Sequence, residues 1–198
     1  ILRGFSAPVV LDFDYSDGQL LTLLANDPDP FNRWEAGQRL ALRSAIHVIA
    51  NNAANTGASV LNDAYLSAMR SVLRSPQLDA AFKEMVLTLP SETYIAEQLD
   101  VVDPQLIHDV RETMRLQIAT SLQSDWEWAF DAHQDNGAYT PDATSAGRRA
   151  LTGMALNYLC LAATHSGDAV WPGKALQRFK DAGNMTDQAN ALQALVAS

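Results

Sequence analysis

Hydrophobic residues recur along most of this chain every three or four positions, which is typical of amphipathic helices. After residue 103 the step is mostly four residues, in the set Ile107, Val110, Met114, Ile118, Leu122, Trp126 and Phe130. Each such step overshoots a 3.6-residue turn by about 40°. The spacing therefore predicts one long helix, to about residue 133, whose apolar stripe winds so that its two ends contact different neighbours.

Capping and turn residues divide the rest of the chain into further helices. Asp29-Pro30 and Asp103-Pro104 each combine a capping side chain with proline in the first turn, and Thr140-Pro141 is expected to do the same. Ser16, Ser59, Ser75-Pro76 and Ser91 are the other expected starts. We expect helices over about 16–24, 30–52, 59–74, 75–88, 91–99, 103–133, 140–164, 167–182 and 184–198.

The first residues depart from this helical pattern. Val9, Leu11, Phe13 and Tyr15 alternate with more polar positions, the period-two pattern of a half-buried strand. A lone strand leaves its backbone edges unsatisfied, and no other convincing strand follows in the sequence. We therefore expect residues 1–15 to pair with strands that lie upstream in a longer chain.

The expected fold is all-α, an irregular superhelical array of antiparallel helical hairpins (an α-α superhelix) with that one strand at its start. A four-helix bundle would leave several helices unplaced. Small residues crowd the 140–164 helix, among them Ala146, Ala150 and Gly153. They predict a close approach between this helix and its neighbours.

Composition narrows the classes of partner. The chain has 198 residues and a formal net charge of −9, and its longest basic feature is the helical pair Arg148-Arg149. Such a chain repels phosphate backbones and anionic membranes overall, so neither nucleic acid nor membrane is an expected partner. Cys160 is the only cysteine, which excludes an internal disulfide and favours a reducing compartment, the cytoplasm.

The sequence contains only weak candidates for a zinc ligand set or a nucleophile. The sequence lacks H-E-x-x-H, the spacing that places two zinc ligands on one helix face. His108 and Glu112, one turn apart, come nearest to a metal pair, but a hydrogen-bonded surface pair is the favoured interpretation. Cys160 stands between Leu159 and Leu161. This setting favours a buried structural thiol over a nucleophile.

The other histidines have structural interpretations. His47 is expected at the edge of the core. His133 and His165 are expected near helix ends, where a cation suits the terminal carbonyl groups.

Paired carboxylates and clustered aromatics do not change this result. Asp125 and Glu127 are two positions apart and point to different faces of a helix, while Asp12 and Asp14 share the solvated face of the strand. An aromatic core is favoured over a stacking platform for Trp126, Trp128 and Phe130. We therefore assign no catalytic, cofactor-binding or metal-binding residue to this chain.

Five short strings keep a specific order along the sequence: LRGFSAPV at 2–9, DPFNRWEA at 29–36, LTLPS at 87–91, DP at 103 followed by VRE at 110–112, and NMTD at 184–187. Together they resemble bacterial aminopeptidase N, a gluzincin-type family of zinc aminopeptidases. The first string resembles the end of that family's β-sandwich domain. The second resembles the start of its C-terminal helical domain.

The resemblance implies that a longer parent protein removes N-terminal residues from peptides, using zinc held by a separate catalytic domain. The strings that carry zinc and bind the substrate amine do not occur here, so this chain is expected to be inactive alone. Residues 1–15 would be the terminal strand of the β-sandwich domain, and 16–198 the first part of the helical domain. That domain would contact the catalytic and β-sandwich domains, enclose the active-site chamber and restrict the access of peptide substrates.

Two other functions stay open at this point. The wide apolar faces and acidic charge permit a free-standing helical-repeat scaffold that binds a protein or peptide in a groove. An independent cysteine or metal enzyme that uses Cys160 or His108 is the weaker alternative.

Overall fold

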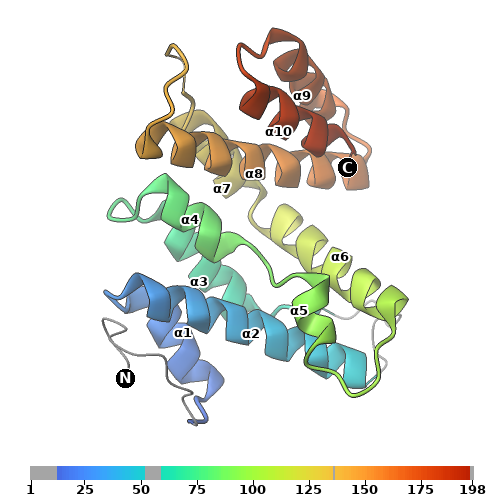
Figure 1. The fold of residues 1–198 in the computed structure, drawn as a ribbon. Helices are drawn as coiled ribbons and strands as arrows, with labels where there is room; N and C mark the ends of the chain where they lie inside the picture. The colour runs from blue at the N-terminus through green and yellow to red at the C-terminus, as the bar shows by residue number, and fades with distance from the viewer. Residues whose placement is uncertain (1–12, 52–58, 136, 197–198) are drawn as a thin grey trace.

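Helices make up the regular structure of this protein (Figure 1). The computed structural model describes residues 13–51, 59–135 and 137–196. Within them lie ten helices: α1 (Asp17–Asn26), α2 (Pro30–Ala50), α3 (Asp63–Arg74), α4 (Ala80–Leu87), α5 (Glu92–Ala96), α6 (Pro104–Ser121), α7 (Gln123–Ala132), α8 (Ala143–Ser166), α9 (Val170–Asp181) and α10 (Met185–Val196). The predicted all-α class is confirmed.

The predicted strand at residues 9–15 falls largely outside the described residues. Its last three positions are described and form neither strand nor helix. Phe13 and Tyr15 meet edge to face with ring centroids 4.7 Å apart, and Arg43 of α2 donates to the Tyr15 carbonyl at 2.7 Å. The division into a strand segment at 1–15 and a helical unit at 16–198 stays a prediction.

Four helix starts agree with the capping signals in the sequence. Ser16 and Gln19 form a reciprocal capping box at α1. Asp29 and Asp103 each accept two backbone N–H groups of the following turn, and Ser91 accepts the Tyr94 N–H at 3.1 Å. These caps satisfy donors that have no partner inside the helix.

Three other starts lie later than predicted. The caps are Asn62 rather than Ser59, Asp79 rather than Ser75, and Asp142 rather than Thr140. In each case a short side chain nearer the helix accepts the backbone N–H three positions on, at 2.8 to 3.0 Å. Pro172 is accommodated in α9 because it lies in the first turn, where its missing N–H is not needed.

The long helix predicted from residue 103 to 133 is two helices, α6 and α7. The chain breaks at Leu122, whose φ of −113° and ψ of 20° are not helical. The Trp126 indole N–H turns back to the Ile118 carbonyl at 3.3 Å. The predicted change of neighbours is present, since α6 packs on α2 and α5 while α7 packs on α3. This change of neighbours occurs at a bend at Leu122, whereas the sequence pattern predicted one continuous helix with a winding apolar stripe.

Helix α8 is the centre of the packing and contacts α4, α6, α7, α9 and α10. In Figure 1 it separates the α9–α10 hairpin from the helices that precede it. At Gly147 a Cβ atom would lie 2.8 Å from the Ala81 backbone nitrogen of α4 and 2.9 Å from its Cβ. The glycine therefore permits an approach that alanine would block, which confirms the close packing predicted for this helix.

Candidate functional site

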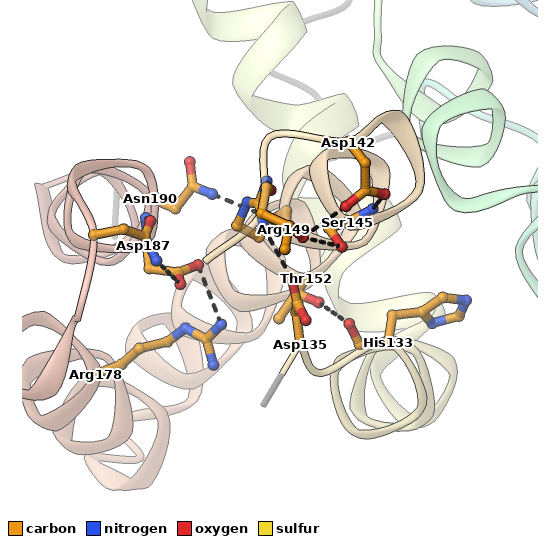
Figure 2. A network of polar contacts seen from close by, with 11 residues as sticks. His133, Asp135, Asp142, Ser145, Arg149, Thr152, Arg178, Asp187 and Asn190 are labelled. Carbon is orange, nitrogen blue, oxygen red and sulfur yellow. Dashed lines mark hydrogen bonds and ion pairs between the residues drawn. The ribbon is translucent and has the colours of Figure 1, made fainter. Parts of the chain in front are cut away.

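A polar hollow of about 720 Å³ lies where the turn after α7 meets α8, α9 and α10. Its lining includes three cationic side chains from two helices, Arg149 of α8 and Lys174 and Arg178 of α9. Carboxylates from the turn and from α9 and α10 face the same space. Figure 2 shows the network of hydrogen bonds and ion pairs around Arg149 and Arg178.

Arg149 is the buried centre of this network, with 4% of its surface exposed. Its two terminal nitrogens donate to the Asp135 carboxylate at 2.9 Å and to the Thr140 carbonyl at 2.8 Å. Its guanidinium carbon lies 4.6 Å from the centroid of the Tyr139 ring. Nε has no hydrogen-bond partner among the described residues. The arrangement clamps the turn between α7 and α8 onto α8.

The α9–α10 hairpin is tied to the same turn. Arg178 of α9 donates to the Gln134 side chain at 2.6 Å and lies 3.5 Å from the Asp187 carboxylate of α10. Asn184 also donates to Asp187, at 2.7 Å. Asn190 of α10 donates to the Arg149 carbonyl at 3.2 Å. Protein groups thus hold both arginines, and the network joins four structural elements without presenting a nucleophile and its base.

Asp142 shows how hydrogen bonds stabilise charge at the edge of this network. Its carboxylate accepts from the Thr140 hydroxyl at 2.6 Å and from the Ser145 N–H at 3.0 Å. The Thr140 hydroxyl has the largest effect, and together these donors hold the pKa of the Asp142 carboxyl well below its usual range. The carboxylate stays ionised and caps α8.

A second buried charge lies between α3 and α7. Asp125 accepts from Arg70 at 2.8 Å and from Arg74 at 2.7 Å, and the Arg74 guanidinium lies 4.4 Å from the Trp128 ring centroid. Burial acts to raise the pKa of Asp125, but the hydrogen bonds and charges of the two arginines outweigh it and lower that pKa. From the sequence, Asp125 was compared only with Glu127, and neither arginine was predicted as its partner.

The structure corrects two of the histidine interpretations. His108 contacts Glu92 of α5, 2.9 Å from its Nδ1, rather than Glu112, which pairs with Arg115. This hydrogen bond raises the pKa of His108. His47 is exposed rather than at the edge of the core, because the neighbouring Ala45 and Val48 take the buried face of α2.

The histidines near helix ends are placed as expected, with one change in charge. His165 lies in the last turn of α8. His133 is the C-cap of α7, and its Nδ1 lies 2.9 Å from the Ala129 carbonyl, which requires a proton on Nδ1. Burial lowers the pKa of His133. Its neutral form is therefore favoured, contrary to the expected cation.

The thiol and the aromatic residues belong to the core. Cys160 is buried, and burial raises the pKa of its thiol to about 11, which disfavours the thiolate. Trp126 is fully buried and stacks on Tyr158, with ring centroids 4.7 Å apart. Trp128 and Phe130 are partly buried and pack against the same core. The expected burial of the thiol and of the aromatic cluster is confirmed.

Metal-binding clusters and membrane-crossing helices are both absent from the described residues. No group of three or more His, Cys, Asp or Glu side chains is arranged to hold a metal ion in ranges 13–51, 59–135 and 137–196. Over the same residues, the helices are each too short or too polar to cross a lipid bilayer.

Sequence patterns contained a signal for the buried charges. Arg149 is in helical register with Thr152, Leu156 and Leu159, all of which are buried. Asp125 shares a face with Leu122 and Ala129 in the same way. A charged residue in a core stripe marks a buried ion pair, but its partner cannot be read from local spacing.

Comparison with known families gives a match over nearly the whole chain. A family described as a domain of unknown function (DUF3458_C), with ARM repeats, matches residues 17–198. The chain belongs to this family. Its ARM-repeat description agrees with the array of antiparallel helical hairpins observed here.

Curated relatives carry the name aminopeptidase N. The chain is 36% identical to the Caulobacter vibrioides protein over 99% of its length and 32% identical to the Escherichia coli protein over 100% of its length. It spans 22% of the length of each relative. The resemblance drawn from the five ordered strings is thereby confirmed.

A solved structure supports the same relation. Legionella pneumophila aminopeptidase A, determined in complex with aspartic acid, matches with a TM-score of 0.79 and 26% identity. The match covers 98% of this chain and 23% of that protein. The helical array described here thus corresponds to a helical region of a larger aminopeptidase.

Proposed function

We propose that this chain is a non-catalytic helical segment of a zinc-dependent aminopeptidase that removes N-terminal residues from peptides. In this role it packs against the catalytic and β-sandwich domains of the longer polypeptide, helps to enclose the active-site chamber and limits access to it. Zinc belongs to the catalytic domain, and the protein works in the cytoplasm.

The alignment with aminopeptidase N relatives over 99 to 100% of this chain supports the proposal most strongly. The chemistry of the chain agrees with it. Arg149 and Asp125, the charged groups most deeply placed in the two polar networks, are held by protein partners, and Cys160 is a buried thiol. Such groups fix helices in place, which is what the wall of a chamber requires.

Two measurements test the proposal. The chain alone, incubated with zinc and leucine p-nitroanilide, is expected to release no p-nitroaniline. Turnover that a chelator abolishes would mean that the chain carries its own active site. In the second measurement this chain replaces the corresponding segment of the Escherichia coli relative. The chimera is expected to bind zinc and to cleave the same substrate, because a structural segment of the same fold restores the packing.

A second substrate pair tests access to the chamber. The chimera is expected to cleave the chromogenic amino acid anilide while leaving the N-terminus of a folded protein intact. Equal cleavage of a folded protein and of its unfolded form would contradict the access role.

A further inference from the structure

Two hollows on this protein share part of their lining. One, of about 520 Å³, lies over α2, α4 and α5, and the other, of about 430 Å³, lies over α4, α6, α8 and α10. Glu84, Thr88 and Leu89 line both. The hollows therefore meet at the C-terminal end of α4, which packs between α2 and α8 (Figure 1). We call the combined feature the Glu84 groove.

The α2–α4–α5 end of the Glu84 groove is apolar with one charge. Trp34, Met85 and Tyr94 line it, and Met85 and Tyr94 have 46% and 43% of their surface exposed. Among the described residues, Glu84 is the only charged one in the lining of this hollow. Within the same part of the chain Glu84 forms no ion pair, and its carboxylate has a single weak contact, the Thr88 hydroxyl at 3.5 Å.

The α6–α8–α10 end is polar, and the two arginines in its lining already have hydrogen-bond acceptors. Arg115 donates to the Glu112 carboxylate at 2.8 Å and to the side-chain amide oxygen of Asn157 at 2.9 Å, and Arg111 donates to the backbone carbonyl of Pro90 at 2.9 Å. The amide nitrogen of Asn157 and the side chain of Gln193 have no hydrogen-bond partner among the described residues. This end therefore offers amide groups of the kind that bind a peptide backbone.

We propose that the Glu84 groove binds a peptide substrate in extended conformation and takes a Lys or Arg side chain of that peptide at its apolar end. The methylene stem of the side chain packs on Met85 and the two aromatic rings, and its positive charge lies against Glu84. The backbone continues toward Asn157 and Gln193. Helical-repeat arrays present extended binding surfaces of this kind. The identity of the bound peptide as a substrate depends on the proposed function.

Charge complementarity selects this occupant over a neutral or acidic segment. A lone carboxylate in an apolar hollow attracts a cation more strongly than a fully solvated one, because fewer water molecules screen it. Trp and Tyr rings stabilise the same cation through their faces. A carboxylate side chain in this hollow would meet Glu84 at close range and be repelled.

The test uses peptides that an aminopeptidase cannot cut. An N-acetylated, C-amidated pentapeptide of alanine with one central lysine is titrated into the isotopically labelled chain, and the indole N–H resonance of Trp34 is followed by NMR. A peptide with norleucine in place of lysine keeps the stem and removes the charge. The lysine peptide is expected to bind about 3- to 10-fold more tightly than the norleucine peptide at low salt, and an arginine peptide is expected to behave like the lysine peptide.

Variants assign the effect to the groove. Glu84→Gln is expected to make the lysine and norleucine peptides bind equally, while Tyr94→Ser weakens both. Glu127→Gln on α7 and Leu176→Ser on α9 are the matched controls for charge and apolar exposure and are expected to change neither affinity. Thermal unfolding of each variant confirms that it is folded. A lysine peptide that does not saturate the wild-type chain, or that binds Glu84→Gln as it binds wild type, overturns the proposal.

The chimera with the Escherichia coli relative separates this proposal from the proposed function. An active chimera that binds no acetylated lysine peptide would show that other parts of the polypeptide cover the groove, and the groove proposal would then fail while the function stands. An inactive chimera whose groove still binds the peptide would count against the function alone.

Discussion

Two cations are buried to nearly the same degree in this protein, and their surroundings differ. Arg149 on α8 is 4% exposed and has a carboxylate, a backbone carbonyl and an aromatic ring as partners. Lys83 on α4 is 3% exposed, yet its side-chain ammonium makes no hydrogen bond or ion pair with any described residue. Its ammonium lies 5.6 Å from the Trp128 ring centroid. Burial lowers the pKa of Lys83, and Asp79 offsets this only in part.

The difference shows that partners, rather than depth, decide what a buried charge contributes. Removing a charge from water costs several kcal/mol, and close, well-oriented partners recover that cost. The partners of Arg149 offset this desolvation cost, and through them Arg149 holds the α7–α8 turn in place. Lys83 lacks such partners, so little of its desolvation cost is offset. Its methylene stem, rather than its charge, contributes to the packing of α4.

The largest effect is expected for Arg149→Met, which keeps the volume of the side chain and leaves Asp135 without its cation. Because the ion pair is lost from a buried site and Asp135 is left partly buried without its cation, the free energy of unfolding should fall by about 3–5 kcal/mol. Urea denaturation measures it. Arg148→Met, at the exposed neighbouring position, is the control and should change stability by less than about 0.5 kcal/mol. Equal effects of the two substitutions would contradict the comparison.

Asp125→Asn is expected to have an intermediate effect, because Asp125 is buried while Arg70 and Arg74 keep 47% and 39% of their side-chain surface exposed. The loss should be about 1–3 kcal/mol at pH 7. The pKa of Asp125 is lowered in the folded state, so its contribution is complete above the unfolded-state pKa of about 3.9 and is lost as pH falls through the folded-state pKa. The asparagine variant should therefore lose less stability than wild type on acidification. Unfolding curves at pH 7 and pH 3 measure this, and parallel acid profiles would contradict it.

Lys83→Met is expected to leave stability unchanged or to raise it by up to about 1 kcal/mol, because it removes a buried charge that forms no ion pair with a described residue. Since the pKa of Lys83 is lowered on folding, the unfolded chain binds more protons than the folded one between the folded-state pKa and the unfolded-state pKa of about 10.4. Wild-type stability should consequently rise relative to the variant as pH increases toward that value. Denaturation at pH 7 and pH 9.5 tests both parts. A loss above about 2 kcal/mol would show an ion pair that the comparison omits.

The smallest effect concerns His133. Burial lowers its pKa, the positive charges of Lys83 and Arg148 lower it further, and the hydrogen bond to the Ala129 carbonyl acts in the opposite direction. Removing the charge at position 83 should raise the pKa of His133, measured by NMR titration in Lys83→Met. Arg148→Met provides the same test for the other charge. A pKa that falls or stays the same in both variants would contradict these assignments.

Local sequence predicted most of what depends on neighbouring residues. The caps at Asp29 and Asp103 and the burial of Cys160 each follow from a few adjacent positions. The family resemblance came from ordered strings spread along the chain. The break at Leu122 was missed, because a helical stripe can wind continuously or bend, and only the positions of α2, α3 and α5 decide between the two.

The sequence alone therefore determined most of the helices and the resemblance to aminopeptidase N along the chain. The tertiary structure decided which charged groups meet: Arg70 and Asp125 are 55 residues apart in the chain, and Glu92 and His108 are 16 apart. Helix formation is governed by contacts within one or two turns, so it is visible in a local pattern. An ion pair between helices depends on how whole helices pack, and no local spacing contains that information.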